Sequence, residues 1–389
     1  MKNSKWLKTI ESIDTPAYLF DVDEFDRRIN VCKELFPNMP ITFSIKANPY
    51  LVGLAGEGVS HFEVCSPGEL EICISHNVPS DKIIYSGVNK ELSDIKRAME
   101  YGCDIVTAES ILHVKYEQEV AQALGKEVKI LLRLTSGNQF GMSSDVIKSI
   151  LSHREDYPNL IFIGFHYYSG TQKKLKQVLK DISSLEDFLI MIKSELAYAP
   201  ELVEYGPGLS FEYFNLNQSE EQDLTEIAKK INELAKEWPM GLEFGRFAAS
   251  SCGYYATTVK DIKINDGVNY VICDGGIHQL RYYGQTLAMQ IPKIELIKKS
   301  ESNSSEEQPY CICGSLCTVA DVLIREVMLP KLEIGDILIF ENCGAYSMTE
   351  GNLLFLSRDI PKVYAMINGE KIILIRDKIS SHKINSVRI

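Results

Sequence analysis

The sequence predicts an α/β protein, a (β/α)8 barrel followed by a β-rich domain, and two observations carry this prediction. Between residues 41 and 244, eight short apolar runs alternate with stretches whose apolar residues have helical spacing. Such alternation is typical of parallel strands joined by helices. From about Tyr254 the helical spacing disappears, and strand-like runs are separated by turn residues. We therefore expect a barrel over residues 30–253 and a β-rich domain over residues 254–389, with one strand added from residues 1–29.

The barrel prediction depends on the order of these segments. The apolar runs are Ile41–Ile45, Phe62–Val64, Ile83–Ser86, Ile105–Thr107, Val128–Leu134, Ile161–His166, Leu202–Tyr205 and Gly241–Phe244. The stretches with helical spacing are Pro67–His76, Glu91–Tyr101, Ser110–Leu124, Ser143–His153, Lys174–Leu196 and Glu220–Trp238. An open doubly wound sheet is the alternative architecture. No G-x-G-x-x-G motif follows the first run, so the barrel is favoured.

The last third of the chain predicts strands that would form a barrel or a sandwich. These strands are Tyr254–Ile264, Tyr270–Cys273, Ile291–Ile297, Asp321–Met328, Asp336–Phe340 and Lys371–Ile375. The polar stretch Ser300–Gln308 indicates a solvated loop within this domain. The early run Ala17–Phe20 lies before the barrel and is the candidate for its added strand.

Composition excludes several classes of partner. A net charge of −12 argues against nucleic acid and against an anionic membrane surface. No apolar segment follows the N-terminus as in a signal peptide, and no run has the length of a membrane span, so we expect a cytoplasmic protein. The 10 cysteines include no C-x-x-C pair and are expected to be reduced thiols. Cys311, Cys313 and Cys317 fit no common zinc spacing and have no histidine near them, so we expect no metal.

Lys46 stands out because it ends the first apolar run and is followed by Ala-Asn-Pro, which interrupts a strand. An ammonium group is costly to bury, and burial lowers the pKa of a lysine and makes it a nucleophilic amine. Schiff-base chemistry requires such an amine. A lysine exposed at the end of a strand is the simpler interpretation, so the rest of the chain has to decide between the two.

Polar and glycine residues also lie near the ends of the other apolar runs or directly after them. They are Glu63, Ser86–Lys90, Glu109, Arg133, His166–Ser169, Gly206–Gly208 and Glu243–Arg246. In a (β/α)8 barrel the carboxyl ends of all strands meet at one rim, and the active site forms there. The sequence thus predicts an active site at this rim that includes Lys46.

Six motifs in this order resemble those of the fold-type III pyridoxal 5′-phosphate (PLP) enzymes, in particular the diaminopimelate/ornithine decarboxylase family. They are Ser44-Ile-Lys46-Ala-Asn48, Phe62-Glu-Val-Cys-Ser-Pro-Gly-Glu69, Gly164-Phe-His166, Glu243-Phe-Gly-Arg246, Gly314-Ser-Leu-Cys317 and Gly344-Ala-Tyr346. The resemblance covers nearly the whole chain. It implies a PLP-binding barrel, a β-rich C-terminal domain, and active sites completed across a head-to-tail homodimer.

The resemblance also implies catalytic roles for four residues. Lys46 would form the Schiff base with PLP, and His166 would stack on the pyridine ring. Glu243 would pair with the pyridine nitrogen and keep it protonated, which favours decarboxylation over the chemistry of the related racemases. Cys317 would enter from the partner subunit and return a proton to the α-carbon, since a thiol is a suitable acid near neutral pH.

The cofactor phosphate is expected at the glycine turn Gly206-Pro207-Gly208 and at Arg246, whose guanidinium fork matches phosphate oxygens. The family usually has three glycines at this turn, and proline has no N–H, so one donor is missing here. Ser169 and Tyr346 resemble further phosphate ligands. The resemblance places five residues toward the substrate, namely Arg246, Arg281, Thr318, Asp321 and Tyr346.

The substrate end departs from the family pattern. The residue after the cysteine is glutamate in the diaminopimelate enzymes and aspartate in ornithine decarboxylases, but here it is the uncharged Thr318. We therefore expect an amino-acid α-decarboxylase that resembles diaminopimelate decarboxylase. The alternative is a decarboxylase of a non-standard, conjugated or carrier-bound amino acid, as in siderophore or antibiotic pathways. A racemase and a non-catalytic PLP-binding protein are the remaining alternatives.

Overall fold

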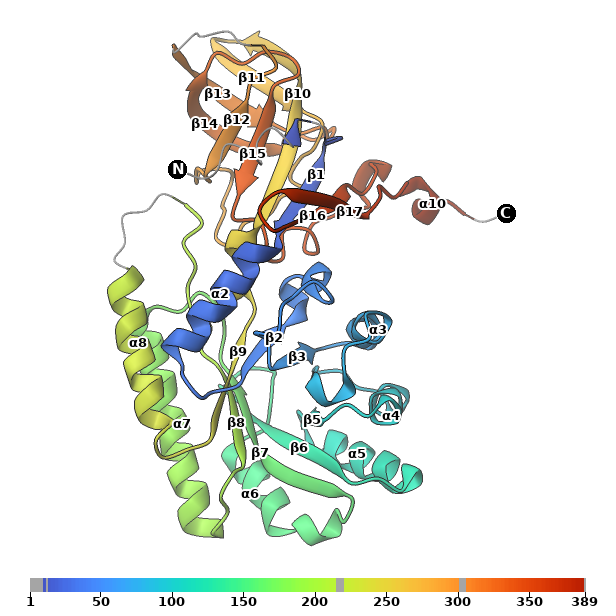
Figure 1. Ribbon diagram of the computed structural model, residues 1–389, viewed down its shortest axis with the longest axis vertical. Coiled ribbons are helices and arrows are strands. Elements are labelled where there is room, and N and C mark those ends of the chain that lie inside the picture. The colour runs from blue at the N-terminus through green and yellow to red at the C-terminus, as the bar shows by residue number, and fades with distance from the viewer. Residues whose placement is uncertain (1–9, 12, 215–219, 301–305, 388–389) are drawn as a thin grey trace. The chain divides into compact units, whose positions relative to one another are not determined.

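The computed structural model describes residues 10–11, 13–214, 220–300 and 306–387. Within these residues the chain divides into two compact units. One is a barrel unit, residues 26–211 and 220–248, and the other is a β-rich unit, whose described residues are 10–11, 13–25, 212–214, 249–300 and 306–387. Figure 1 shows the helices around the barrel strands and the strands of the β-rich unit.

The barrel unit contains a closed parallel barrel in which the strands follow one another in chain order from β2 to β9. The strands are β2 Ile41–Ser44, β3 His61–Val64, β4 Ile83–Tyr85, β5 Ile105–Ala108, β6 Val128–Leu134, β7 Leu160–Tyr168, β8 Leu202–Gly206 and β9 Met240–Phe244. The barrel closes where β9 pairs with β2, with Thr42 opposite Glu243. The predicted (β/α)8 barrel is therefore confirmed, and each predicted apolar run corresponds to one barrel strand.

The helices of the barrel unit begin and end where the sequence supplies caps. They are α2 Val22–Leu35, α3 Pro67–Ser75, α4 Leu92–Tyr101, α5 Ile111–Leu124, α6 Ser144–Ser152, α7 Leu175–Leu196, α8 Glu220–Leu234 and α9 Arg246–Ala249, with α2 and α9 crossing the unit boundary. Ser66, Ser110 and Ser143 cap the N-termini of α3, α5 and α6 by accepting hydrogen bonds from backbone N–H groups. Gly102 and Gly125 end α4 and α5 in the left-handed conformation.

Two helix predictions need correction. Helical spacing predicted a helix to Trp238, but α8 ends at Leu234. Pro239 follows directly after Trp238 and disfavours helical backbone in the residue before it, so the chain leaves the helix in a short turn. The sequence analysis also assigned no helix to α2, although acidic residues in its first turn favour a helix N-terminus there.

The β-rich unit is built on a mixed sheet with the strand order β14-β13-β11-β10-β1-β16-β17, and β15 pairs with both β10 and β12. The strands are β1 Ala17–Asp21, β10 Gly253–Asn265, β11 Val268–Cys273, β12 Ile294–Ile297, β13 Glu307–Cys313, β14 Val322–Pro330, β15 Ile337–Glu341, β16 Lys362–Ile367 and β17 Lys371–Arg376. The short helix α10 spans His382–Asn385. The expected β-rich domain after the barrel is confirmed.

Strands β13 and β16 were not predicted. The first two residues of β13, Glu307 and Gln308, belong to the stretch that the sequence analysis assigned to a polar loop, of which residues 301–305 lie outside the described residues. They instead pair with Pro330 and Leu329 of β14. Pairing with a neighbouring strand satisfies their backbone groups, and a hydrophilic side chain does not prevent it at an exposed position.

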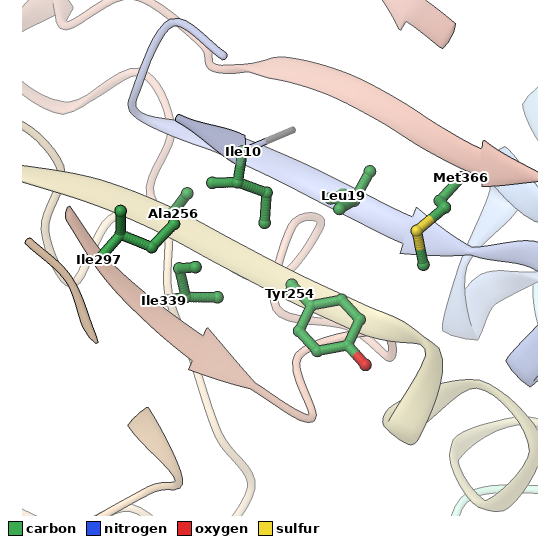
Figure 2. Close-up of a cluster of buried hydrophobic side chains, with 7 residues drawn as sticks. All are labelled: Ile10, Leu19, Tyr254, Ala256, Ile297, Ile339 and Met366. Carbon is green, nitrogen blue, oxygen red and sulfur yellow. The ribbon is translucent and has the colours of Figure 1, made fainter. Parts of the chain in front are cut away.

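The core of the β-rich unit joins segments that are far apart in the chain. Strand β1 pairs antiparallel with β10 and parallel with β16. Figure 2 shows side chains from these strands and their neighbours meeting in one cluster. Its members are Ile10, Leu19, Tyr254, Ala256, Ile297, Ile339 and Met366. Burying each large apolar side chain stabilises the unit by about 1.5–3 kcal/mol.

Among the described residues, no helix combines the length and the apolar character that crossing a bilayer requires.

Candidate active site

Lys46 lies immediately after barrel strand β2, in the short 3-10 turn Ile45–Ala47. Its Nζ atom donates a hydrogen bond of 2.9 Å to Glu63 Oε2 and lies 3.4 Å from Cys65 Sγ. Glu243 Oε1 is 3.8 Å away. The Lys46 side chain is 34% exposed, whereas both carboxylate side chains are only 5% exposed. The amine is therefore held by buried carboxylates and remains accessible from the rim.

Glu243 lies near the end of β9, and its carboxylate contacts several polar groups of the site. Ser44 Oγ donates to its Oε1 at 2.5 Å, and His166 Nε2 lies 3.0 Å from its Oε2. Since an ionised carboxylate only accepts hydrogen bonds, the Nε2 atom of His166 carries the proton. Burial opposes the negative charge of Glu243, but the Lys46 ammonium and the hydrogen bond from His166 outweigh it and lower the pKa of the carboxyl. Glu243 is thus held in its ionised form.

Glu63 and Cys65 come from β3 and the residues after it. The thiol of Cys65 donates to Glu63 Oε1 at 3.0 Å. Burial, and then the charge of Glu63, raise the pKa of this thiol well above its usual range, so it stays protonated. Glu63, His166 and Glu243 place one ligand atom each within 4.8 Å of one another, an arrangement that could hold a metal ion. The Lys46 ammonium already lies among these oxygens, and its charge disfavours a second cation there.

The candidate phosphate-binding residues lie in the loops that follow β7, β8 and β9. The turn Gly206-Pro207-Gly208 includes Gly208 at a φ of +60°, where a Cβ would overlap the backbone oxygen of Gly170. Arg246 is buried at the start of α9, and its Nε donates to Thr171 Oγ1 at 3.2 Å. Only glycine allows the close approach of these two loops.

Ser169, predicted to bind phosphate, is engaged by its neighbours. Its hydroxyl donates to Asp181 Oδ2 at 2.6 Å, and it accepts a hydrogen bond from the Lys173 ammonium. Lys173 also forms an ion pair with Asp181. The structure therefore adds a buried cation to this part of the rim.

Glu204 and Glu109 are buried carboxyl groups of the barrel unit with opposite pKa shifts. Burial raises the pKa of Glu204, on β8, to about 8, with Thr42 partly opposing the shift. Burial also opposes ionisation of Glu109, but the guanidinium of Arg133 outweighs it and lowers the pKa of that carboxyl. Glu109 also accepts a hydrogen bond of 3.0 Å from Gly141 N. Near neutral pH Glu204 is thus largely protonated while Glu109 is ionised.

The remaining candidates lie in the β-rich unit. Cys317 is exposed, and Thr318 is half-buried beside it. The carboxylate of Asp321 accepts hydrogen bonds from the backbone N–H groups of Ile277 and Leu316, at 2.8 and 2.7 Å. One oxygen therefore holds the loop that carries Cys317, and the other ties Asp321 to the segment around Ile277. The last two candidates are Arg281, which is exposed, and Tyr346, which has a φ of +65°.

The structure thus brings together one set of predicted residues and adds others. Lys46, His166 and Glu243 form one connected cluster in the barrel unit. Sequence reasoning assigned no site role to four partners of the predicted residues. They are Glu63, which it noted only as a polar residue at the rim, and Cys65, Lys173 and Asp181. Glu63 could have been found, because a carboxylate in a short apolar run at the rim needs a partner. No local signal identifies Asp181, because a polar residue in a long helix is expected to face solvent.

Comparisons with known proteins show which sequences and structures this chain resembles. The family model described as "Pyridoxal-dependent decarboxylase, C-terminal sheet domain" matches residues 18–344. A relative named L-glutamyl-[BtrI acyl-carrier protein] decarboxylase, from Niallia circulans, is 25% identical over 92% of this chain and 90% of its own length. A diaminopimelate decarboxylase from Bacteroides thetaiotaomicron is 24% identical over 94% of this chain and 98% of its own length.

Two further proteins extend this picture. A 2-[(L-alanin-3-ylcarbamoyl)methyl]-2-hydroxybutanedioate decarboxylase from Staphylococcus aureus is 26% identical over 89% of this chain and 92% of its own length. The crystal structure of diaminopimelate decarboxylase from Helicobacter pylori, complexed with L-lysine, superimposes with a TM-score of 0.84. It covers 97% of this chain and 98% of that chain at 21% identity, so this likeness concerns the fold.

Proposed function

The chain belongs to the pyridoxal-dependent decarboxylase family and is an amino-acid decarboxylase, and from this premise we propose that PLP binds at Lys46 and that the rim cluster removes the α-carboxylate of the substrate. One observation carries the proposal. An accessible amine lies 2.9 Å from Glu63, and it shares the site with Glu243, a buried carboxylate held in its ionised form by the Lys46 ammonium, His166 and Ser44.

The residues at the rim fit this cofactor. Lys46 offers an amine for the aldehyde carbon, and Glu243 offers a negative charge for the pyridine nitrogen. His166 Nδ1 is buried and forms no hydrogen bond with any described residue, so the imidazole ring is not fixed on that side. Gly208 and Arg246 offer a backbone approach and a cation suited to a phosphate group. Amine, carboxylate, imidazole and anion site therefore match the four parts of the cofactor that need a partner.

When bound, PLP withdraws the electron pair that remains on the α-carbon as carbon dioxide departs. The protein's part is electrostatic. The low pKa of Glu243 keeps its carboxylate charged, so this residue would favour a proton on the pyridine nitrogen. Ser44 fixes the orientation of the carboxylate, and Glu63 orients the Lys46 amine toward the rim.

Cys317 is our candidate for the acid that returns a proton to the α-carbon. Its thiol is exposed, and Asp321 fixes the backbone of its loop through Leu316 N. We propose that a second copy of the chain, in a head-to-tail homodimer, supplies this thiol. Apart from Cys317, no cysteine among the described residues is exposed.

The distal end of the substrate is the less constrained part of the proposal. Relatives named as diaminopimelate decarboxylases favour a free diamino acid with a second charged end. Thr318 offers no charge for such an end. A conjugated or carrier-bound amino acid has no free ammonium group at that end for a carboxylate to bind, and the relatives from Niallia circulans and Staphylococcus aureus carry names of that kind. Both substrate classes share the same decarboxylation at the α-carbon.

The test measures carbon dioxide release by the PLP-loaded protein on meso-diaminopimelate, ornithine, lysine, arginine, glutamate and diaminopropionate. In parallel, borohydride reduction followed by peptide mass analysis asks whether Lys46 carries the cofactor. Lys46→Ala should lose both the mass label and the activity. Lys176→Ala removes an exposed lysine and is the matched control.

The outcomes separate the alternatives. Turnover of meso-diaminopimelate alone would identify a diaminopimelate decarboxylase. Labelling of Lys46 without turnover of any free amino acid would favour a conjugated or carrier-bound substrate. A Lys46→Ala protein as active as the parent would refute the proposed mechanism.

A further inference from the structure

A polar cluster of three residues lies beside the candidate phosphate turn. Ser169 comes from the loop after β7, Lys173 ends that loop, and Asp181 lies in α7. Lys173 is 6% exposed, and its ammonium donates to both Ser169 Oγ and Asp181 Oδ2. Ser169 in turn donates to Asp181 Oδ2 at 2.6 Å. The resemblance to the family drew attention to Ser169, but it gave no role to the other two residues.

Counting hydrogen-bond donors separates the serine from the lysine. A serine hydroxyl has one O–H group, and here Asp181 receives it. An ammonium group has three N–H groups. Two of those of Lys173 are used within the cluster, and no third hydrogen bond from Nζ is formed to any described residue. In this arrangement Lys173 can still donate to an anion, whereas Ser169 cannot.

The lysine is also fixed against the turn that the phosphate would face. Its backbone N–H donates to Gly208 O at 3.0 Å. A Cβ at Gly208 would lie 3.4 Å from Lys173 Cε, and one at Gly170 would lie 3.9 Å from the same atom. The aliphatic part of Lys173 therefore packs along both glycines, which brings its ammonium to the side of the turn.

The turn needs such a cation. A phosphate monoester carries about two negative charges near neutral pH. Pro207 removes one backbone N–H from the turn, and Arg246 brings one positive charge. A second cation would replace the missing N–H donor and balance the second negative charge of the phosphate. A charge-assisted hydrogen bond is about twice as strong as a neutral one.

We propose that Lys173 is the second cation of the cofactor phosphate site, and that Ser169 and Asp181 position its ammonium without binding the phosphate themselves. This inference rests on the proposed binding of PLP at Lys46. Asp181 keeps Lys173 charged in its buried position until the anion arrives, since burial lowers the pKa of this lysine and the carboxylate opposes that shift.

The experiment compares the affinity of the protein for PLP with its affinity for pyridoxal, which lacks the phosphate group. Both are measured by absorbance titration and by borohydride labelling of Lys46, so no substrate is needed. Lys173→Met should weaken PLP binding by about 10- to 100-fold and change pyridoxal binding less than about twofold. Lys176→Met removes an exposed lysine near the start of the same helix and should change neither affinity.

Asp181→Asn distinguishes an anion site from an ordinary buried ion pair. The inference predicts that this variant binds PLP more weakly than the wild type, because the buried Lys173 loses the carboxylate that keeps it charged, and that its affinity for pyridoxal changes less than about twofold. Equal losses for PLP and pyridoxal in Lys173→Met and in Asp181→Asn would indicate a structural ion pair and overturn the inference. Unchanged PLP affinity in a folded Lys173→Met protein would also overturn it.

If Lys173→Met does not fold, Lys173→Arg and Ser169→Ala replace it. Both should bind PLP within about threefold of the wild type. A tenfold loss for PLP alone in Ser169→Ala, with Lys173→Arg unaffected, would assign the phosphate to the serine and overturn the inference. A wild-type protein that binds neither PLP nor pyridoxal would instead refute the proposed function, and this inference with it.

Discussion

Replacing Glu243 by glutamine tests the electrostatic part of the proposed mechanism. The amide has nearly the same shape as the carboxylate but no charge. It also has one accepting oxygen where the carboxylate has two, and Ser44 Oγ and His166 Nε2 now use one each, at 2.5 and 3.0 Å. Lys46, 3.8 Å away, would lose one of its two anionic partners and keep Glu63. The amide oxygen can keep one of these two hydrogen bonds, and Glu63 still holds the Lys46 amine, so the site should stay assembled while it loses the charge.

The size of the effect follows from what the carboxylate does. Each charge-assisted hydrogen bond contributes about 1.5–3 kcal/mol, against about 0.5–1.5 kcal/mol for a neutral one. Loss of a buried electrostatic group aimed at the reacting system typically lowers kcat by about 10²–10³-fold. We expect Glu243→Gln to fall in this range while its folded structure, measured by circular dichroism, stays intact.

The assay is carbon dioxide release at saturating PLP, with the substrate found in the panel described above. Glu71→Gln makes the same chemical change at an exposed carboxylate of α3 and should leave the rate unchanged. A second readout needs no substrate. Without the carboxylate the pyridine nitrogen loses its proton more readily, so the absorbance of the bound cofactor should titrate at lower pH. A Glu243→Gln enzyme within twofold of the wild-type rate would refute the assigned contact.

Three further predictions concern stability, the glycine turn and the proton donor. Burial raises the pKa of Glu204 to about 8 from a usual value of 4.5, so the folded protein keeps a proton that the unfolded chain releases, and stability falls as the pH rises from about 4.5 to about 8. Glu204→Gln should remove this loss, on the order of 5 kcal/mol, from denaturant curves recorded across that range. An unchanged pH profile would contradict the buried, protonated carboxyl. Gly208→Ala should destabilise the protein by about 1–3 kcal/mol and weaken PLP binding, because the new Cβ would meet a backbone oxygen at positive φ. Gly206→Ala would meet a movable tyrosine ring and should destabilise the protein less, so equal losses of stability in thermal unfolding would contradict this prediction. Cys317→Ala should keep PLP affinity but slow turnover or change the product, and an unaltered rate and product would remove the thiol from the mechanism.

Local patterns were sufficient for the barrel because each strand and helix has its own signal. Two examples are the apolar run Ile41–Ile45 and the helical spacing of Ser110–Leu124. Each predicts an element that the structure contains at nearly the same bounds. The β-rich unit was harder to predict. The polar start of β13 resembles a loop until Leu329 is known to lie opposite Gln308. Strand pairing between distant segments leaves little local signal.

The residues of the candidate site also differ in whether local sequence patterns identify them. Residue types and their order identified Lys46, His166 and Glu243, since buried strands rarely end in charged groups without a reason. Their partners could not be read from spacing. Glu63 and Glu243 are far apart in the chain, yet both lie within 4 Å of the same ammonium.

The sequence by itself determined the alternation of strands and helices in the barrel, the change to strand-rich sequence near Tyr254, and the lysine at the end of the first barrel strand. These features follow from side-chain periodicity and backbone preferences, which act over a few residues. Only the tertiary structure decided that Glu243 stays ionised while Glu204 keeps its proton, and that Lys173 rather than Ser169 has a donor left for an anion. The physical reason is that charge state and hydrogen-bond partners depend on burial and on groups brought close by the closing of the barrel, and neither is encoded in the spacing along the chain.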